Sequence, residues 1–228
     1  MKKIIFLILF TFHLYGQINS AKVKYNLIIG QDEKISQDER MGALFEKAQN
    51  GSKKISFSLV FNKKASLFSM NEMIEDEDTS LAKIFSGANS TFYTEVGTEK
   101  KIKQTEGAFG KFIINYTHRT DWNLENESKL INSYLCYKAT SELIVTNSKG
   151  TFKFPVTAWY CPSIPFSYGP NGYDGLPGLI LELQERFTVY GVEKIDLSTN
   201  EIVIEKPTKG KIVTQEEFNE IVKKPPTF

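Results

Sequence analysis

The chain contains very few arginines, histidines and cysteines. Only three of its 28 basic residues are arginine, and the 228 residues include two histidines and two cysteines. Arginine is the side chain that reads bases and phosphates bidentately, so its scarcity argues against a nucleic-acid reader. The 27 acidic residues nearly balance the basic ones, at a formal net charge of +1, so no overall field attracts a polyanion. We therefore expect no nucleic-acid binding.

Long apolar runs are also lacking, since none approaches the roughly 18 residues that a membrane-spanning helix needs. The longest run covers residues 4–15, follows two lysines, and is followed by small residues at 16, 20 and 21. This pattern predicts a signal peptide over residues 1–20, with cleavage between 16 and 21. A buried or anchoring N-terminal segment is the alternative. No cysteine lies near this junction for lipid attachment, so we expect a periplasmic or secreted product, residues 21–228, without a transmembrane segment.

The chain is rich in apolar residues, with 41% hydrophobic and 13% aromatic content. Along most of its length these residues alternate with polar ones, which is typical of half-buried strands. The sequence therefore predicts a mainly β (α+β) single domain built on one curled antiparallel sheet. The expected strands are 22–30, 54–62, 65–70, 91–96, 110–116, 134–139, 142–146, 151–160, 179–185, 188–196 and 201–206.

Two or three short helices are expected beside the sheet. Ser36 and Glu39 form a capping-box pattern ahead of an apolar helical face at positions 41, 44, 45 and 48. A second helix is predicted at 80–85. Thr214 and Glu217 form another capping-box pattern ahead of apolar residues at 218, 221 and 222. The acidic run at 75–78 is interpreted as a solvated turn, because it lacks the ligand spacing and glycine of a calcium loop.

The strongest local feature is the glycine-rich segment 168–183, YGPNGYDGLPGLILEL. Its turn dipeptides, and a type II turn predicted at 176–179, precede an apolar strand. A phosphate cradle is excluded because no Lys-Ser or Lys-Thr pair follows and the next element is a strand. The segment is either a structural corner or a surface loop that contacts a partner. The residues for such a contact are Pro170, Asn171, Gly172, Tyr173 and Asp174.

The hexapeptide within this segment resembles the signature of the GLPGLI family, secreted proteins of Bacteroidetes-type bacteria. Further segments fall in the family's order, including 131–140 (INSYLCYKAT), 158–160 (AWY), 164–165 (IP) and 169–170 (GP). The resemblance covers roughly residues 20–225, and Ser133 departs from it, because the family usually has glycine before Tyr134. The hexapeptide consists of Gly175, Leu176, Pro177, Gly178, Leu179 and Ile180.

The resemblance implies little about activity, because the family is largely uncharacterised and no catalytic residues are established for it. Its members are similar to periplasmic proteins that are often encoded beside TonB-dependent outer-membrane receptors. Their expected shape is similar to the open half-barrel of periplasmic lipoprotein carriers. An outer-membrane receptor is therefore one partner that the resemblance suggests.

Cys136 and Cys161 are the only cysteines, and an exported chain with an even number of them normally pairs them. We expect a disulfide between them, with the intervening residues forming a hairpin. A redox-active pair would need closer spacing, and a metal site would need more ligands than these thiols and His118 supply. The sequence therefore predicts no metal site.

Catalytic patterns are sparse. No Gly-x-Ser-x-Gly elbow accompanies His118, and the carboxylate pairs Glu125 with Glu127 and Glu182 with Glu185 resemble solvated faces. Cofactor motifs are absent from the sequence. We therefore expect no catalytic residues and no cofactor.

Two functional classes remain ahead of an enzyme, with a hydrolase the less favoured third. The first is a non-enzymatic accessory or binding protein that serves an outer-membrane receptor. The second is a carrier that holds a lipid or another apolar ligand in the half-barrel. For the carrier, the concave face is either a binding surface or simply the core, and the oligomeric state stays open. The residues expected on that face are Phe57, Leu59, Phe61, Phe112, Ile114, Trp159, Leu181 and Leu183.

Overall fold

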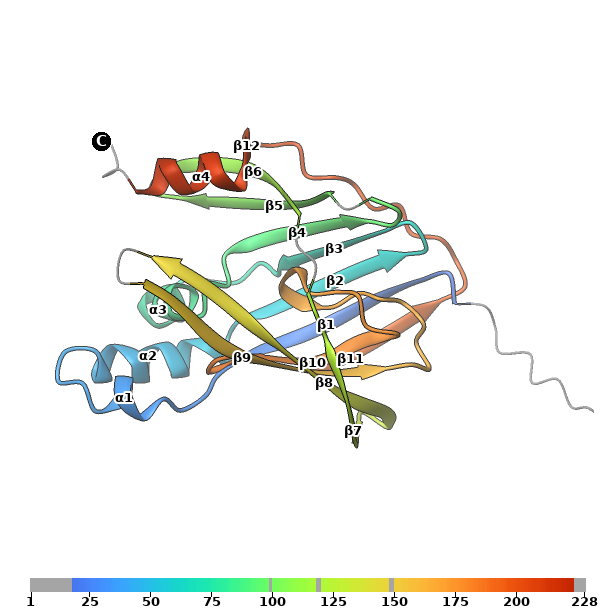
Figure 1. The fold of residues 1–228 in the computed structure, drawn as a ribbon, viewed down its shortest axis with the longest axis horizontal. Coiled ribbons are helices and arrows are strands. Elements are labelled where there is room, and N and C mark those ends of the chain that lie inside the picture. The colour runs from blue at the N-terminus through green and yellow to red at the C-terminus, as the bar shows by residue number, and fades with distance from the viewer. Residues whose placement is uncertain (1–17, 99, 118–119, 148–149, 224–228) are drawn as a thin grey trace, which may run out of the picture.

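The computed structural model describes residues 18–98, 100–117, 120–147 and 150–223, which build one open, strongly curved sheet of twelve strands (Figure 1). The strand order is β12-β6-β5-β4-β3-β2-β1-β11-β10-β9-β8-β7. This confirms the mainly β, unclosed sheet. The sheet is mixed, since β12 pairs parallel with β6 while the other pairs are antiparallel. The strands are β1 Ser20–Ile29, β2 Ser56–Asn62, β3 Ala65–Met70, β4 Ser90–Glu95, β5 Lys100–Gly107, β6 Gly110–Thr117, β7 Asn123–Ile131, β8 Tyr134–Asn147, β9 Gly150–Cys161, β10 Leu179–Glu185, β11 Thr188–Ser198 and β12 Lys211–Thr214.

Four short helices accompany the sheet, one more than the largest number expected. Helices α1 to α3 gather at one end of the sheet and α4 lies beside β6 (Figure 1). No helix in the described residues is long and apolar enough to cross a membrane. The helices are α1 Glu33–Ser36, α2 Gly42–Ser52, α3 Glu77–Ser86 and α4 Gln215–Val222, with a 3₁₀ turn, η1, at Pro170–Gly172.

The helix starts follow local side-chain chemistry. The Thr214 and Glu217 capping box is confirmed at the start of α4. The Ser36 and Glu39 box is wrong, because Ser36 ends α1 and the nearer carboxylate of Asp38 accepts the backbone N–H groups of residues 40 and 41. A further capping box, at the acidic run, joins Asp76 to Thr79 at the start of α3.

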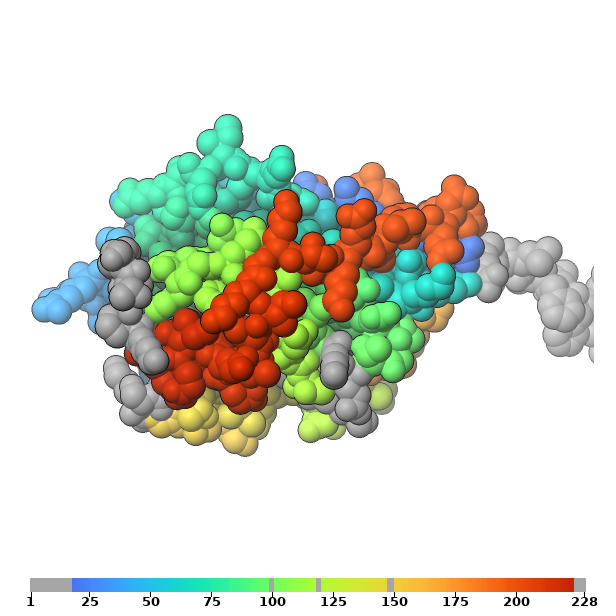
Figure 2. All heavy atoms as spheres, turned by 90° about the horizontal axis from the view of Figure 1, so that it is seen from above, coloured from blue at the N-terminus to red at the C-terminus, as the bar shows by residue number. Residues whose placement is uncertain are grey.

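Strands with few apolar residues escaped sequence-based prediction. Strands β5 and β7 are mainly polar, and β12 has only four residues. In the opposite direction, the strand expected at 201–206 is wrong: these residues form an irregular segment between β11 and β12. Figure 2 shows this crossing segment, residues 199–210, in orange to red, lying across the green strands. Because it crosses the strands, its backbone cannot pair regularly with them.

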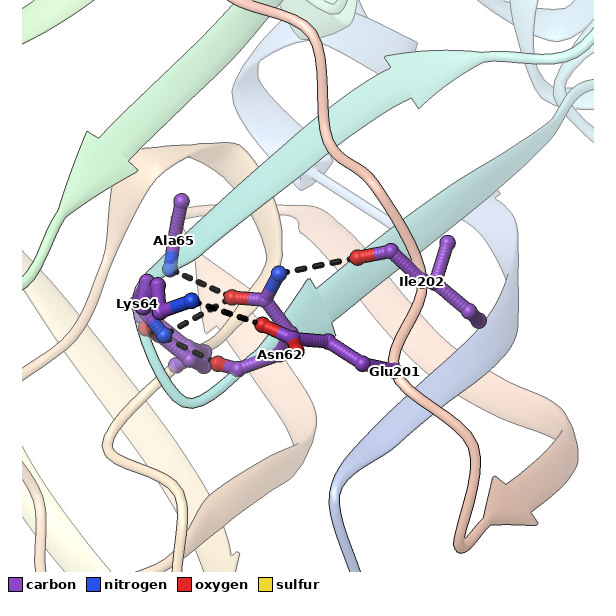
Figure 3. Close-up of polar contacts among 6 residues, drawn as sticks. Asn62, Lys64, Ala65, Glu201 and Ile202 are labelled. Carbon is purple, nitrogen blue, oxygen red and sulfur yellow. Dashed lines mark hydrogen bonds and ion pairs between the residues drawn. The ribbon is translucent and has the colours of Figure 1, made fainter.

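The crossing segment is attached through side chains of the β2–β3 turn (Figure 3). The Asn62 side-chain amide donates to the carbonyl of Ile202 at 2.8 Å, and its oxygen accepts the N–H groups of Lys64 and Ala65 at 2.7 and 2.8 Å. The Lys64 ammonium pairs with Glu201 at 2.9 Å. Asn62 therefore shapes the turn and holds the crossing segment at once.

Candidate functional site

The glycine-rich loop, defined here as residues 162–178, packs onto the core of the sheet. Alternate side chains along it are buried, while Pro165, Ser167, Gly175 and Pro177 between them are exposed. The buried side chains, all part of the main core cluster, are Ile164, Phe166, Tyr168, Tyr173 and Leu176.

The apolar face proposed for a carrier is filled by the chain itself. Phe57, Leu59, Phe61, Leu181 and Leu183 are at most 1% exposed and belong to the same core cluster as the loop. The remaining members of the expected set lie elsewhere. Phe112 and Ile114 pack with Val213 and α4 in a separate cluster, and Trp159 is only half-buried, with the Lys129 ammonium over its ring.

The hexapeptide 175–180 forms the corner where the loop enters β10. Its turn lacks the bond from the amide of Leu179 to the carbonyl of Leu176 that the predicted type II turn would make. The Leu179 amide donates to Ile164 instead, and the Gly178 amide donates to the Leu176 carbonyl. A side chain at Gly178 would be blocked, because a Cβ there would lie 2.3 Å from the carbonyl oxygen of Cys161.

A buried ion pair joins the loop to β5. The Lys101 ammonium lies 2.7 Å from the Asp174 carboxylate, and the two side chains are 7% and 19% exposed. The Trp122 indole N–H donates to the backbone carbonyl of Asp174 at 2.8 Å. At Gly172, a Cβ would lie 2.6 Å from the Phe92 ring, so only glycine lets the loop approach β4 this closely. Residues 170–174, expected to contact a partner, thus lie against the chain's own strands, with Pro170 and Tyr173 buried and the other three half-buried.

Beside the loop lies an open cleft of about 670 Å³, within the size range of small-molecule sites. We call it the loop–hairpin cleft, because Tyr173 of the loop and β8 of the β8–β9 hairpin form its walls. Most of its lining residues carry carboxylate, amide or hydroxyl groups, although apolar atoms make up the larger part of the lining surface. The lining residues are Thr120, Asp121, Asn123, Thr140, Ser141, Glu142, Leu143, Ile144 and Tyr173.

Behind the cleft, polar side chains converge on Glu185 at the end of β10. The Asn171 amide donates to its carboxylate at 3.2 Å, and Tyr173 is hydrogen-bonded to it as well. Desolvation by burial raises the pKa of Glu185, and it also lowers the pKa of the Lys103 ammonium nearby. The Tyr190 hydroxyl, which is fully buried among the described residues, has no hydrogen-bond partner there; its pKa is raised by burial and by Glu185.

The two cysteines lie side by side but are not bonded. The β8–β9 register pairs Tyr137 with Tyr160, which sets Cys136 opposite Cys161 at the next position. Both thiols are free and buried, so the expected disulfide is absent from this structure although its partners are adjacent. The hydrogen bond from Cys136, then those from Ser163 and the Ile164 amide, lower the pKa of the Cys161 thiol, while the same thiol pair raises the pKa of Cys136.

Other candidate groups are scattered. Glu125 and Glu127 share Lys138, and Glu182 pairs with Lys129, so these carboxylates form ion pairs at the surface. Within the described ranges, no three His, Cys, Asp or Glu side chains lie close enough to hold a metal ion. His118 and the predicted signal peptide up to residue 17 fall outside the described residues.

Sequence reasoning missed the central groups of this region. Lys101 and Arg186 carried no motif, since a lysine in a polar strand and an arginine at a strand end are common. Glu185 was expected on a solvated face, which is wrong, because it is half-buried and burial raises its pKa. The one usable signal was the Glu-Arg-Phe-Thr sequence at 185–188, where two strands follow each other too closely for anything but a tight turn.

Comparisons with known proteins add a family of unknown function and a fold. A family model described as "Protein of unknown function (Porph_ging)" matches residues 148–182, a region that contains the hexapeptide 175–180. No curated protein matches the sequence. PNGF-II in a C2 crystal form is similar in structure, with a TM-score of 0.56, 10% identity, and coverage of 90% of this chain and 33% of that one. PNGF-II in a P21 crystal form gives 0.54 with the same identity and coverage, so the chain spans about a third of the length of these structures.

Proposed function

We propose that this protein is an exported binding protein that holds a polar ligand in the loop–hairpin cleft. The observation that carries the proposal is the difference between the concave apolar face of the sheet and the loop–hairpin cleft. The concave apolar face is filled by the chain's own loop, whereas the cleft of about 670 Å³ beside that loop is open and has polar side chains at six of its nine lining positions. An apolar cargo would find no free surface in the filled face, and this favours the binding protein over the lipid carrier.

The chemistry of the lining selects the ligand. Asp121 offers an exposed carboxylate, and Asn123 offers an amide that both donates and accepts. The exposed carboxylate of Glu142 is already ion-paired with Lys153. Such a set favours a solute with several hydrogen-bond donors, and Tyr173 supplies an apolar ring at the cleft wall. Binding is proposed rather than catalysis, and a broad hydrolase screen in which turnover disappears with Asp121→Ala would overturn that choice.

The experiment is native mass spectrometry on protein purified gently from its own periplasm. We expect a polar small molecule to co-purify and to be lost in Asp121→Ala and Asn123→Ala, whose side chains are exposed and whose removal leaves the core intact. Glu205→Ala, an exposed change on the crossing segment, is the matched control and should retain the ligand. Recovery of ligand-free protein, or of a lipid instead, would contradict the proposal.

The start of β1 bears on where the proposed signal peptide would be cleaved. Ser20 and Ala21 are fully buried and pair with Ser198 and Leu197, and the Asn19 amide donates to the Ser198 carbonyl at 2.9 Å. Cleavage after residue 21 would remove this part of the strand. We therefore propose a mature start between residues 17 and 19, which N-terminal sequencing of exported protein would check.

In an oxidising compartment we also propose that Cys136 and Cys161 join, because the two thiols already lie in hydrogen-bond contact. Closing the intervening loop of roughly 25 residues would stabilise the fold by about 3 kcal/mol. Because both thiols are buried, the exported protein is alkylated in denaturant. Alkylation only after reduction is the expected result; labelling of both thiols without reduction would refute it.

Service to an outer-membrane receptor is proposed on the sequence resemblance alone. The exposed side of the loop suits the test: photo-crosslinkers at Ser167 and Pro177 should capture a receptor in the native host. A crosslinker at Glu205 is the control, and equal capture from all three positions would count against a loop-specific contact.

A further inference from the structure

A second hollow lies beyond Leu143, between the tip of the β8–β9 hairpin and the end of α3. We call it the aromatic slot; its volume is about 320 Å³. One wall is formed by two cross-strand pairs, Leu143 with Phe154 and Val145 with Phe152. Val145 and Phe152 remain 37% and 40% exposed, so the slot is open to solvent. Its apolar lining consists of Phe85, Leu143, Val145, Phe152, Phe154 and Phe187.

Arg186 stands at the rim of the slot in a strained conformation. It is the first central residue of the two-residue turn between β10 and β11, with φ of +54°. Glycine is the residue favoured at a positive φ in such turns, and any other side chain costs free energy there. Strain of this kind tends to persist where the side chain has a function.

The Arg186 guanidinium is held over two aromatic rings. Its central carbon lies 4.1 Å from the Phe154 ring centroid and 4.9 Å from that of Phe187. Among the described residues, no carboxylate forms an ion pair with it. Its donors are therefore positioned beside an apolar slot, and Glu185 interacts with its charge without forming an ion pair.

The charges around the rim favour an anion at this point. Glu185 also lines the slot, but Tyr173 and Asn171 already bond its carboxyl group and burial raises its pKa. The opposite end of the slot, at Ser86 and Gly87, is the C-terminus of α3, whose carbonyls carry partial negative charge. A bound anion would therefore lie at Arg186 and not at the helix end.

We propose that the aromatic slot binds a monocarboxylate with an aromatic or branched aliphatic body. The apolar body lies among the phenylalanine rings, and the carboxylate accepts two hydrogen bonds from the Arg186 guanidinium, the geometry for which arginine is suited. This assignment accounts together for the strained arginine, its missing counter-ion and the exposed apolar wall. It does not depend on a ligand in the loop–hairpin cleft.

The experiment compares three probes by isothermal titration: 3-phenylpropionate, its primary amide and 3-phenylpropylamine. We expect the carboxylate to bind at least about tenfold more tightly than the amide, because the neutral amide offers the Arg186 guanidinium no negative charge. The amine should bind most weakly. Equal affinity for the acid and the amide would overturn the proposal, as would tightest binding of the amine.

Variants separate the role of Arg186 from a structural one. Arg186→Gly suits the positive φ, so we expect its unfolding temperature to stay unchanged or rise while the preference for the acid disappears. Arg186→Lys should keep part of that preference as a point charge, and Phe152→Ser should weaken acid and amide equally. An Arg186→Gly variant that still binds the acid more tightly than the amide would refute the assignment, whatever its stability. Asp121→Ala should leave binding in the slot unaffected, so this proposal and the one for the loop–hairpin cleft can be refuted independently.

Discussion

The buried ion pair between Lys101 and Asp174 provides the sharpest test of how the glycine-rich loop is held. Their side chains are 7% and 19% exposed, and the charged atoms are 2.7 Å apart. Replacing Asp174 by alanine would leave an ammonium buried without its counter-ion, and such losses cost about 3–5 kcal/mol. In a domain of this size that corresponds to a fall in unfolding temperature of about 6–20 °C.

The assay is urea unfolding of Asp174→Ala, Lys101→Met and the double variant. Because the double variant buries no unpaired charge, we expect it to be more stable than Asp174→Ala, with a coupling energy of about 2 kcal/mol or more. The matched control is the exposed pair Lys153 with Glu142, at 62% and 56% exposure, where alanine at Glu142 should cost under about 1 kcal/mol. Additive single losses, or a loss for Asp174→Ala no larger than for the control, would refute the reasoning.

Three further outcomes follow from other contacts. Asn62→Ala should cost about 1–3 kcal/mol in urea unfolding, because it removes three hydrogen bonds of a buried side chain, and an unchanged midpoint would refute this. Ser133→Gly should stabilise the fold by roughly 0.5–1 kcal/mol in calorimetry, since Ser133 has φ of +68°, and destabilisation would contradict this. Burial raises the pKa of Glu185 in the folded state, so its stabilising contribution is full below about pH 4 and is lost as the pH rises through that pKa. Glu185→Gln should therefore gain stability relative to wild type between pH 4 and pH 7. A stability difference that does not depend on pH would refute the raised pKa.

The alternation of apolar residues predicted the core strands well because it reports burial directly. Strand β10 begins and ends where the sequence predicts, at Leu179 and Glu185, since its leucines face the core. Strand β7 was invisible because it forms one edge of the sheet and most of its side chains face solvent. The residues at 201–206 alternate too, yet they cross other strands, and sequence alone does not say whether a half-buried extended segment has a partner to pair with.

The candidate sites were less predictable, because they arise where distant segments meet. The sequence drew attention to the glycine-rich loop, and its burial could be guessed from its aromatic residues. Nothing local indicates that Asn171, Lys103 and Glu185 meet, since they come from the loop, from β5 and from the end of β10. The structure explains why the family that the sequence resembles usually has glycine at the position of Ser133. Asn132 and Ser133 form a two-residue turn in which both have positive φ, and glycine is favoured in such a turn.

The non-glycine residues at positive φ fall into two groups that differ in what their side chains do. Asn132 and Ser133 form the β7–β8 turn, where both side chains are exposed. Asn171 and Arg186 adjoin Glu185 instead: one donates a hydrogen bond to its carboxylate and the other places a positive charge beside it. Glycine would relieve the backbone in either group. At Asn171 it would also remove a hydrogen bond to the half-buried carboxyl group of Glu185. Relief at Ser133 is therefore a pure gain in stability, whereas at Asn171 the lost hydrogen bond offsets that gain.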